Sequence, residues 1–242
     1  MRTTPQSYSQ FGQDRLIAAL FDHKRGGTFI EIGAYDGETF SNAAMLERSY
    51  GWRGICIEPL PGAFARLQHS RKAICVNAPA GSTAGKLRFE AIDGHGAMLS
   101  GATGTRPTAH DARIGREQRH HGFERQMIEV DKVRAADLLR QHDMRRVDFA
   151  SIDVEGAELD CLRGLLDKDI TVMTLAIENN YGETDVADYL AERGYVRLTT
   201  AGEDDIFKLR SELGPRDHLR RLLAAPQRWE RDRKRRRNAR KV

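Results

Sequence analysis

Residues 29–37 read Phe-Ile-Glu-Ile-Gly-Ala-Tyr-Asp-Gly, a short apolar strand followed by a glycine turn with a carboxylate on either side. At the end of a buried parallel strand the chain must turn sharply, and Gly33 and Gly37 allow both this turn and the close approach of a ligand. A loop for pyrophosphate would avoid fixed negative charge, because it uses the positive end of the next helix. Glu31 and Asp36 therefore favour a ligand with a positive charge or with hydroxyl groups.

Strand-like and helix-like segments alternate along most of the chain. Strands are expected at 28–32, 54–58, 72–77, 147–154 and 171–178, with an extra edge strand at 86–91 and an antiparallel pair at 195–199 and 205–209. Helices are expected at 11–22, 41–50, 62–69, 135–141, 157–166 and 186–193. Strands separated by helices predict a parallel sheet with right-handed crossovers and cover on both faces. The expected fold class is therefore α/β, with a doubly wound sheet.

One domain is expected for residues 1–214, followed by a basic tail at 215–242. Residues 93–127 break the alternation, since they are rich in glycine, histidine and arginine and show no period. They are expected to form an inserted loop or lid, because long loops inside a compact domain are usually functional or disordered. The formal charge of the chain is +4, of which the tail carries +9, so residues 1–214 carry −5. An acidic body is not typical of a fold that grips nucleic acid across its surface.

Partners and compartment are less constrained by the sequence. The tail suits an anionic membrane surface, nucleic acid or a partner protein, and a solvated end is the simplest alternative. Cys56, Cys75 and Cys161 lie far apart, which favours buried thiols over a disulfide and indicates a reducing, cytoplasmic setting. The apolar run at 16–21 is too short for a signal peptide or a membrane span. A homodimer is compatible with the sequence, which contains nothing that decides the oligomeric state.

The second predicted strand ends in Glu58 and Pro59, with Glu58 twenty-two residues after Asp36. An acid at the tip of the neighbouring strand accepts hydrogen bonds from both hydroxyls of a ribose, although an acid at a strand end can also simply face solvent. A dinucleotide site would show Gly-x-Gly-x-x-Gly, but Tyr35 stands where the second glycine would be. The combination indicates a positively charged nucleoside without phosphate, which fits S-adenosylmethionine.

These residues resemble the FkbM-type S-adenosylmethionine-dependent methyltransferases. The resemblance extends by order and spacing over roughly residues 7–200. Its most specific part is the block at 151–158, Ser-Ile-Asp-Val-Glu-Gly-Ala-Glu, and it also includes the motifs at 29–37, 41–42, 54–59 and 76–78. It implies a Rossmann-like class I methyltransferase fold, with a mostly parallel seven-stranded sheet and an antiparallel last strand.

The resemblance also implies how the cofactor would be held. The residues it assigns are Glu31, Gly33, Asp36 and Ser41 for the methionine end, Glu58 and Pro59 for the ribose, Asn77 and Ala78 beside the adenine, and Gln13 or Asp14 near the cofactor. Gln and Asp at a helix start are also ordinary helix caps, so that alternative stays open for the last pair.

Asp153 and Glu155 are the candidate catalytic residues. Asp153 ends the fourth strand at the edge where open α/β sheets bind ligands, so it is also a candidate cofactor contact. Methyl transfer to an alcohol requires that the acceptor oxygen loses its proton to a base or is stabilised by a metal. Asp153, Glu178 and Asn179 would lie on adjacent strand tips and would suit Mg²⁺, although such residues also close turns. Glu158 is expected only to start a helix.

A histidine base is the other possibility, because the pKa of histidine suits proton removal near neutrality. The candidates are His95, His110, His120, His121 and His142. The sequence does not distinguish among them, and any one of them is more typical of a surface loop.

The sequence thus predicts a cytoplasmic S-adenosylmethionine-dependent O-methyltransferase. The resemblance implies as acceptor a hydroxyl on a sugar, a glycan or a natural-product intermediate, either a small molecule or a larger glycan. Two alternatives stay open: an RNA methyltransferase guided by the basic tail, and a cofactor-binding adaptor that does not catalyse.

Overall fold

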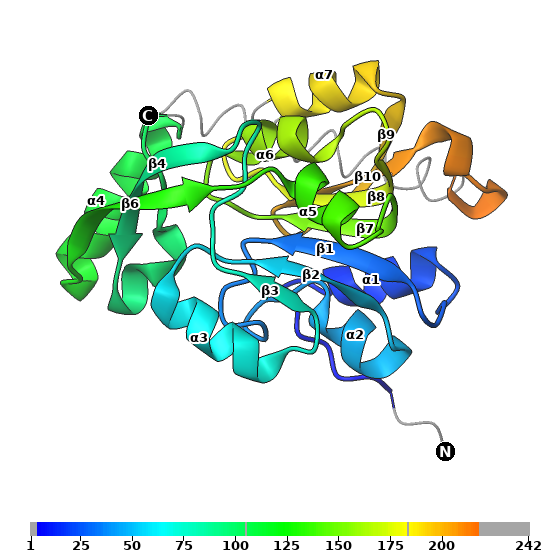
Figure 1. The fold of residues 1–242 in the computed structure, drawn as a ribbon, viewed down its shortest axis with the longest axis horizontal. Coiled ribbons are helices and arrows are strands. Elements are labelled where there is room, and N and C mark those ends of the chain that lie inside the picture. Colours follow the sequence, from blue (N-terminus) through cyan, green and yellow to red (C-terminus); the bar gives the residue numbers. More distant parts are fainter. Residues whose placement is uncertain (1–3, 105, 183, 218–242) are drawn as a thin grey trace.

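The computed structural model describes residues 4–104, 106–182 and 184–217 (Figure 1). Its main sheet has seven strands: β1 (Thr28–Ile32), β2 (Arg53–Ile57), β3 (Ile74–Val76), β7 (Arg146–Ile152), β8 (Thr171–Glu178), β9 (Tyr195–Ala201) and β10 (Asp204–Leu209). The order is β3-β2-β1-β7-β8-β10-β9. Neighbours from β3 to β8 are parallel, and β10 runs antiparallel to β8 and β9. This confirms the predicted fold class, a doubly wound and mostly parallel sheet with an antiparallel last strand.

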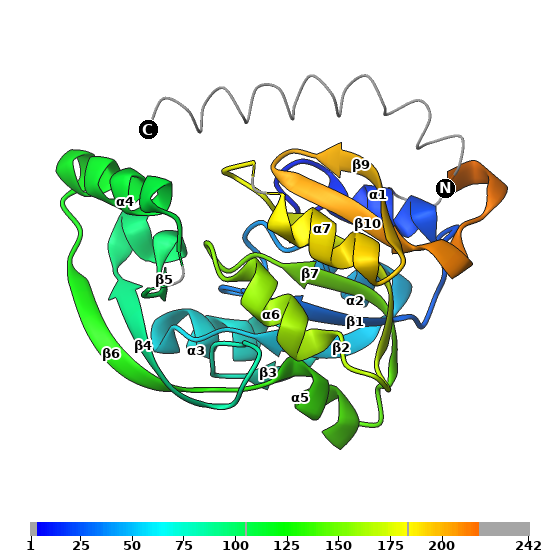
Figure 2. The ribbon, with the colours of Figure 1, turned by 90° about the horizontal axis from the view of Figure 1, so that it is seen from above.

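Helices cover both faces of this sheet (Figure 2). One face carries α1 (Gln13–Leu20), α2 (Ala44–Tyr50) and α3 (Pro61–Ser70), and the other carries α5 (Ala135–Gln141), α6 (Glu158–Leu165) and α7 (Asp185–Glu192). The side chains of β1 alternate between the two layers: Ile30 and Ile32 pack with α5 and α6, whereas Phe29 packs with α1 and α2. The strand is therefore apolar on both faces, as a central parallel strand requires.

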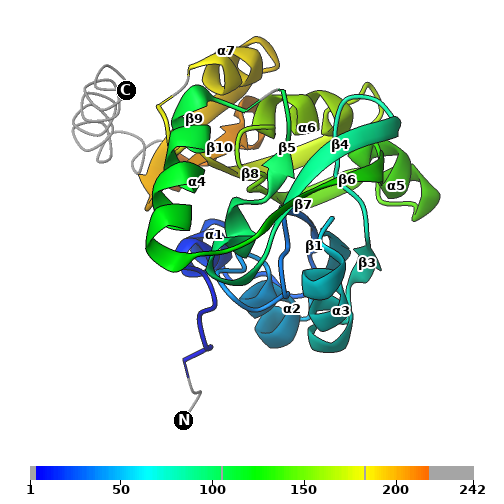
Figure 3. The same cartoon turned by 90° about the vertical axis from the view of Figure 1, so that its left-hand side faces the viewer.

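The segment predicted as an irregular insert is folded, which corrects the prediction of a loop without secondary structure. It contains the 3₁₀ helix η1 (Gly94–Leu99), β5 (Gly101–Ala102), α4 (Thr108–His121) and the start of β6 (Arg125–Lys132). The strand β4 (Gly85–Ile92), predicted as an edge strand, is the central strand of a second sheet with the order β5-β4-β6. We call residues 85–104 and 106–132 the cap. Figure 3, seen from the side of the cap, shows β4 and β6 in front of the main sheet.

The sequence signal for α4 is weak for a physical reason. Only His110 and Ile114 of its fourteen residues are buried, so the helix lacks the apolar stripe that a 3.6-residue period would reveal.

A short 3₁₀ helix, η2 (Arg210–Glu212), follows β10. Most of the predicted basic tail, residues 218–242, lies outside the described residues. Within the part of the chain that the structure describes, no helix is both long and apolar enough to cross a membrane.

Candidate functional site

A cavity of about 240 Å³ lies between the cap and the carboxyl ends of the parallel strands. Its sheet side is formed by residues at or just beyond the ends of four strands, namely Ile32, Gly33, Ile57, Glu58, Asp153 and Glu178. Its cap side includes Leu87, Phe89, Ala97, Met98 and Arg113. This is the edge at which open α/β sheets bind their ligands.

The cavity is strongly acidic. Two of its lining residues are basic, Arg113 and Lys132, whereas seven are acidic: Glu58, Asp153, Glu155, Asp160, Glu178, Glu203 and Asp204. Such an excess of carboxylates favours a ligand with positive charge and opposes a phosphate group.

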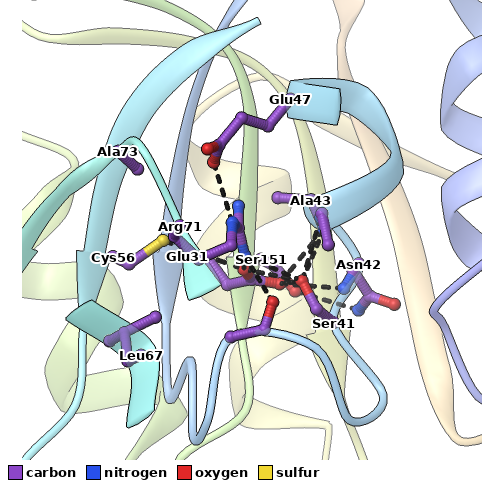
Figure 4. Close-up of polar contacts among 12 residues, drawn as sticks. Glu31, Ser41, Asn42, Ala43, Glu47, Cys56, Leu67, Arg71, Ala73 and Ser151 are labelled. Carbon is purple, nitrogen blue, oxygen red and sulfur yellow. Dashed lines mark hydrogen bonds and ion pairs between the residues drawn. The ribbon is translucent and has the colours of Figure 1, made fainter. Parts of the chain in front are cut away.

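Glu31, predicted to contact the cofactor, is buried beside Ser41 and Arg71 (Figure 4) and is not among the residues that line the cavity. Its carboxylate accepts hydrogen bonds from the Ser41 hydroxyl at 2.9 Å and from the backbone amides of Asn42 at 2.8 Å and Ala43 at 3.1 Å. Arg71 Nη1 donates to the same carboxylate at 2.8 Å. Glu31 and Ser41 therefore hold the β1–α2 turn in place and do not line the cavity, which corrects their predicted direct contact.

Arg71 completes this buried network. Its side chain has no exposed surface, and its Nε donates to Glu47 Oε2 at 2.8 Å while Nη1 also reaches the Gly37 carbonyl oxygen at 3.1 Å. Arg71 directly follows α3, and its guanidinium thus contacts the end of β1, the turn between β1 and α2, and α2 itself. The position of the first turn depends on this ion pair between Arg71 and Glu31.

Asp36 is also turned toward its own loop. Its carboxylate accepts hydrogen bonds from the Glu38 and Thr39 amides at 3.0 and 2.8 Å and from the Thr39 hydroxyl at 2.7 Å. Burial alone would raise the pKa of Asp36, but these hydrogen bonds hold that pKa below its ordinary value. Asp36 does not line the cavity. This corrects the prediction that its carboxylate contacts the methionine end of the cofactor.

Gly33 does line the cavity, and the structure gives a further reason for glycine there. Its φ is +85°, and a Cβ would lie 1.8 Å from the Asp153 carbonyl oxygen. The close approach of the β1 and β7 ends therefore requires glycine, whether or not a ligand is bound.

Glu58 lines the cavity from the tip of β2, with Pro59 beside it. Its two carboxylate oxygens accept the backbone amides of Tyr35 and Leu60, each at 2.8 Å. Burial raises the pKa of Glu58 to about 7, although these two hydrogen bonds oppose the shift. Glu58 is thus fixed at the strand tip and titrates near neutrality.

The predicted adenine pair divides between two roles. Ala78 lines the cavity, but Asn77 does not, because its side-chain amide donates to the carbonyl oxygens of Glu58 at 2.8 Å and Pro59 at 3.1 Å. Asn77 therefore supports the β2 tip from behind.

Gln13 lines the cavity, whereas Asp14 is turned toward residues 7–9. The Gln13 amide donates to Asp204 Oδ2 at 3.1 Å, and the Asn42 amide donates to the same oxygen at 3.0 Å. Asn42 and Asp204 are lining residues that the sequence analysis did not assign. The available signals were the place of Asn42 in the quoted family motif and the acidic run at 203–205.

Three carboxylates meet at the β7 and β8 tips, where oxygens of Asp153, Glu155 and Glu178 lie within 4.8 Å of one another. Asp153 and Glu178 follow β7 and close β8, which are neighbouring parallel strands of the main sheet. Desolvation and the negative charge of the neighbouring acids raise the pKa of both groups well above its ordinary value. Ionisation of either carboxyl is therefore less favourable here than in an isolated acid.

Asn179, the third predicted metal ligand, is not part of this cluster. Its Oδ1 accepts the Gly182 amide at 2.8 Å and its amide nitrogen donates to Asp205 at 3.3 Å, so it closes the turn after β8. The three-ligand set predicted for Mg²⁺ is therefore not assembled, and Glu155 occupies the third place.

The turn between β7 and α6 is shaped by Glu158, as expected for a residue that starts a helix. Its carboxylate accepts the amides of Val154 at 3.3 Å and Gly156 at 3.1 Å. Glu155, between them, adopts a left-handed backbone with φ of +54°, which is rare for residues other than glycine.

Among the five candidate histidines, only His110 is buried, and it contacts Glu155. The other four are exposed. His110 itself is not in the lining of the cavity, so no histidine among the described residues faces the space where an acceptor would bind.

The doubly wound sheet and the acidic cavity at its strand ends define the class as a Rossmann-like enzyme that binds a nucleoside cofactor. The model of the Methyltransferase FkbM domain family matches residues 31–197, and the chain belongs to that family. Membership makes the protein a methyltransferase of a family that depends on S-adenosylmethionine. The predicted resemblance is thereby confirmed.

Two solved structures have a related but distant shape. The delta-N METTL16 MTase domain is 12% identical, with 80% of this chain and 78% of that chain covered and a TM-score of 0.38. The precorrin-6y C5,15-methyltransferase from Geobacter metallireducens GS-15 is 11% identical, with 80% and 84% covered and a TM-score of 0.37. Likeness at these TM-scores carries no argument about the acceptor. No curated protein matches this chain.

The residues of the cavity fit S-adenosylmethionine. The carboxylate excess suits its sulfonium and ammonium charges, and Glu58 offers carboxylate oxygens at the strand tip. Asn42 is buried and has a side-chain oxygen without a hydrogen-bond partner among the described residues, so an acceptor is available for an ammonium group.

We expect Arg71→Met to lower the free energy of unfolding by about 3–5 kcal/mol, because Glu31 and Glu47 would stay buried without their counter-charge. Urea denaturation measures this loss. Arg66→Met on the exposed face of α3 is the matched control, with an expected change under about 1 kcal/mol. A similarly small change for Arg71→Met would show that the first turn does not depend on this ion pair.

Proposed function

We propose that the protein transfers the methyl group of S-adenosylmethionine to a hydroxyl oxygen on a sugar, a glycan or a natural-product intermediate. The observation that carries this proposal is a single cavity with Glu58 at one strand tip, a carboxylate cluster at another, and the wall of the cap opposite them. When bound, the cofactor supplies an electrophilic methyl group on a sulfonium centre.

The side of the cavity at the β1 and β2 tips suits the cofactor. Glu58 would accept hydrogen bonds from the ribose hydroxyls, and Ala78 and Pro59 would flank the base. Asn42 would accept a hydrogen bond from the ammonium group, with its orientation fixed by bonds to Ser151 at 2.9 Å and Asp204 at 3.0 Å.

The side of the cavity formed by the cap suits the acceptor, because it is apolar. Five large apolar side chains are exposed in the described part of the chain, and three of them line this one cavity: Met98 from the cap, and Phe11 and Phe40 from outside it. Leu87 and Phe89 add to the wall. This gathering of apolar side chains around one cavity supports an acceptor that presents a ring face or another apolar surface to the protein.

Glu155 is the residue best suited to take the proton of the acceptor hydroxyl. Its carboxylate belongs to a residue that lines the cavity, and it is held by His110 Nδ1 at 3.1 Å and Arg113 Nη1 at 3.5 Å. In the proposed step the acceptor O–H bond breaks toward Glu155, the oxygen forms a bond to the methyl carbon, and the methyl–sulfur bond breaks. Asp153 would orient the charged end of the cofactor.

The experiment that tests this function is incubation of the purified protein with methyl-labelled S-adenosylmethionine and a cell extract, followed by identification of the labelled product. A labelled hydroxyl on a small molecule or glycan would support the proposal. Label in RNA, lost at high salt, would favour the alternative guided by the tail. Tight cofactor binding without any labelled product would favour the adaptor.

Binding of S-adenosylhomocysteine is expected to weaken about tenfold as the pH falls from 8 to 6, because the pKa of Glu58 is about 7 and its protonated form loses acceptor capacity. Below this pKa the carboxyl is neutral in the free protein, so binding to ribose hydroxyls costs its deprotonation. Calorimetric titration measures the effect.

Glu58→Ala is expected to weaken binding by about 1.5 kcal/mol or more at pH 8. Glu58→Gln, which cannot titrate, should remove the pH dependence between 6 and 8. Unchanged affinity in both variants would contradict the ribose assignment.

Met98→Ser is expected to raise KM for the labelled acceptor about fivefold or more while the affinity for S-adenosylhomocysteine stays the same, because part of an apolar contact is lost. Met127→Ser is the matched control, since Met127 belongs to the same cap and is 43% exposed against 38% for Met98, but lies outside the cavity. Equal effects of the two variants would show that the acceptor does not bind against this wall.

Methyl transfer is expected to survive thorough EDTA treatment, because Asn179, one of the three predicted ligands, is committed to the turn after β8. The rate before and after chelation decides this point. A loss of turnover that added Mg²⁺ restores would establish the metal dependence considered from the sequence.

A further inference from the structure

His110 connects the cap to the turn that carries Glu155. The residue belongs to α4, has no exposed surface, and lies outside the lining of the cavity, whereas Glu155 is part of that lining. Its Nδ1 lies 3.1 Å from Glu155 Oε2 and 3.0 Å from the Tyr181 hydroxyl, and its Nε2 lies 3.1 Å from the Leu99 carbonyl oxygen. One ring thus joins the cap, through Leu99, to the turns that follow β7 and β8.

The partners of the ring assign its two nitrogens. A carbonyl oxygen only accepts hydrogen bonds, so Nε2 must carry the hydrogen that it shares with Leu99. Nδ1 is then the nitrogen that faces Glu155 and Tyr181, and it donates to the Glu155 carboxylate when the ring carries a hydrogen on both nitrogens. The two nitrogens therefore have separable roles, one within the cap and one toward the carboxylate at the cavity wall.

The same part of the cap packs directly on the Glu155 turn. A Cβ at Gly156 would lie 2.7 Å from Pro107 Cδ and 3.0 Å from Arg106 Cβ, so the start of α4 rests on this backbone. Arg113, one turn beyond His110, places Nη1 3.5 Å from Glu155 Oε2. The left-handed backbone of Glu155 is thus held by contacts that come from the cap.

We propose that His110 is a positioning residue, which fixes the Glu155 carboxylate at the cavity wall through Nδ1. This inference rests on the proposed function, in which Glu155 receives the proton of the acceptor. Because the cap also provides Met98 and Leu87 to the acceptor side, binding of the acceptor and placement of the base are coupled through one folded unit.

Two conservative variants separate the roles of the ring nitrogens. Asn places its amide close to the position of Nδ1, so His110→Asn keeps a donor toward Glu155 and loses the bond to Leu99. Gln reaches the position of Nε2, so His110→Gln keeps the bond to Leu99 and loses the contact with Glu155. His121→Asn and His121→Gln, on the exposed side of the same helix, are the matched controls.

The first measurement is the rate of labelled methyl transfer from S-adenosylmethionine to the acceptor found in extract, together with calorimetry of S-adenosylhomocysteine. We expect His110→Gln to lower kcat about tenfold or more, with KM and cofactor affinity nearly unchanged, because a misplaced base slows the chemical step alone. His110→Asn should recover most of kcat. The proposal would be overturned if kcat fell as much in His110→Asn as in His110→Gln, or fell further. His110 would then only stabilise the cap.

The second measurement does not depend on turnover. Hydrogen exchange of the backbone amides at 154–157 should be faster in His110→Gln than in His110→Asn, and Glu155→Ala should in turn speed exchange in the first two turns of α4. Unchanged exchange in α4 of Glu155→Ala would overturn the coupling. If the unaltered protein transfers no label, the proposed function fails, whereas these exchange rates still decide whether His110 holds the Glu155 turn.

Discussion

The buried ion pair between Glu31 and Arg71 is the constraint on which the geometry of the site depends. Taking both charges out of water is costly, so each must be satisfied by several partners at once. Glu31 gathers the Ser41 hydroxyl and the first amides before α2, while Arg71 brings in Glu47 and the Gly37 carbonyl. The first turn is thereby fixed, and its Tyr35 amide in turn holds Glu58 at the tip of β2.

The sequence predicted the main sheet well because its strands are apolar on both faces and its helices carry a clear apolar stripe. The parallel direction of its strands follows from the helices that separate them in the sequence. The cap escaped prediction because its elements bury little: α4 buries two side chains, and β6 alternates between exposed and half-buried residues. Its position is specified instead by pairing with β4 and by contacts such as that of His110, which join residues far apart in the chain.

The sequence predicts a site residue correctly where its position at the end of a strand is enough to place it at the cavity. Gly33, Glu58 and Asp153 reach the cavity because all parallel strands end at one edge. It was not predictable where side-chain direction decides it: Glu31 is one residue from Ile32 at the strand tip, yet alternation turns its carboxylate into the α2 layer. Asn42 and Asp204 are 162 residues apart and meet only in the folded sheet. No local pattern could pair them.

An acidic cavity suits a cationic cofactor, but it creates a difficulty for the chemistry. Carboxylates this close oppose one another's ionisation, and together with burial this raises the pKa of Asp153 and Glu178 well above its ordinary value. Glu155, the proposed base, is the member of this cluster that contacts two side chains of the cap, His110 at 3.1 Å and Arg113 at 3.5 Å. Both come from α4. The cap therefore supplies the side chains that hold the proposed base within a group of like charges.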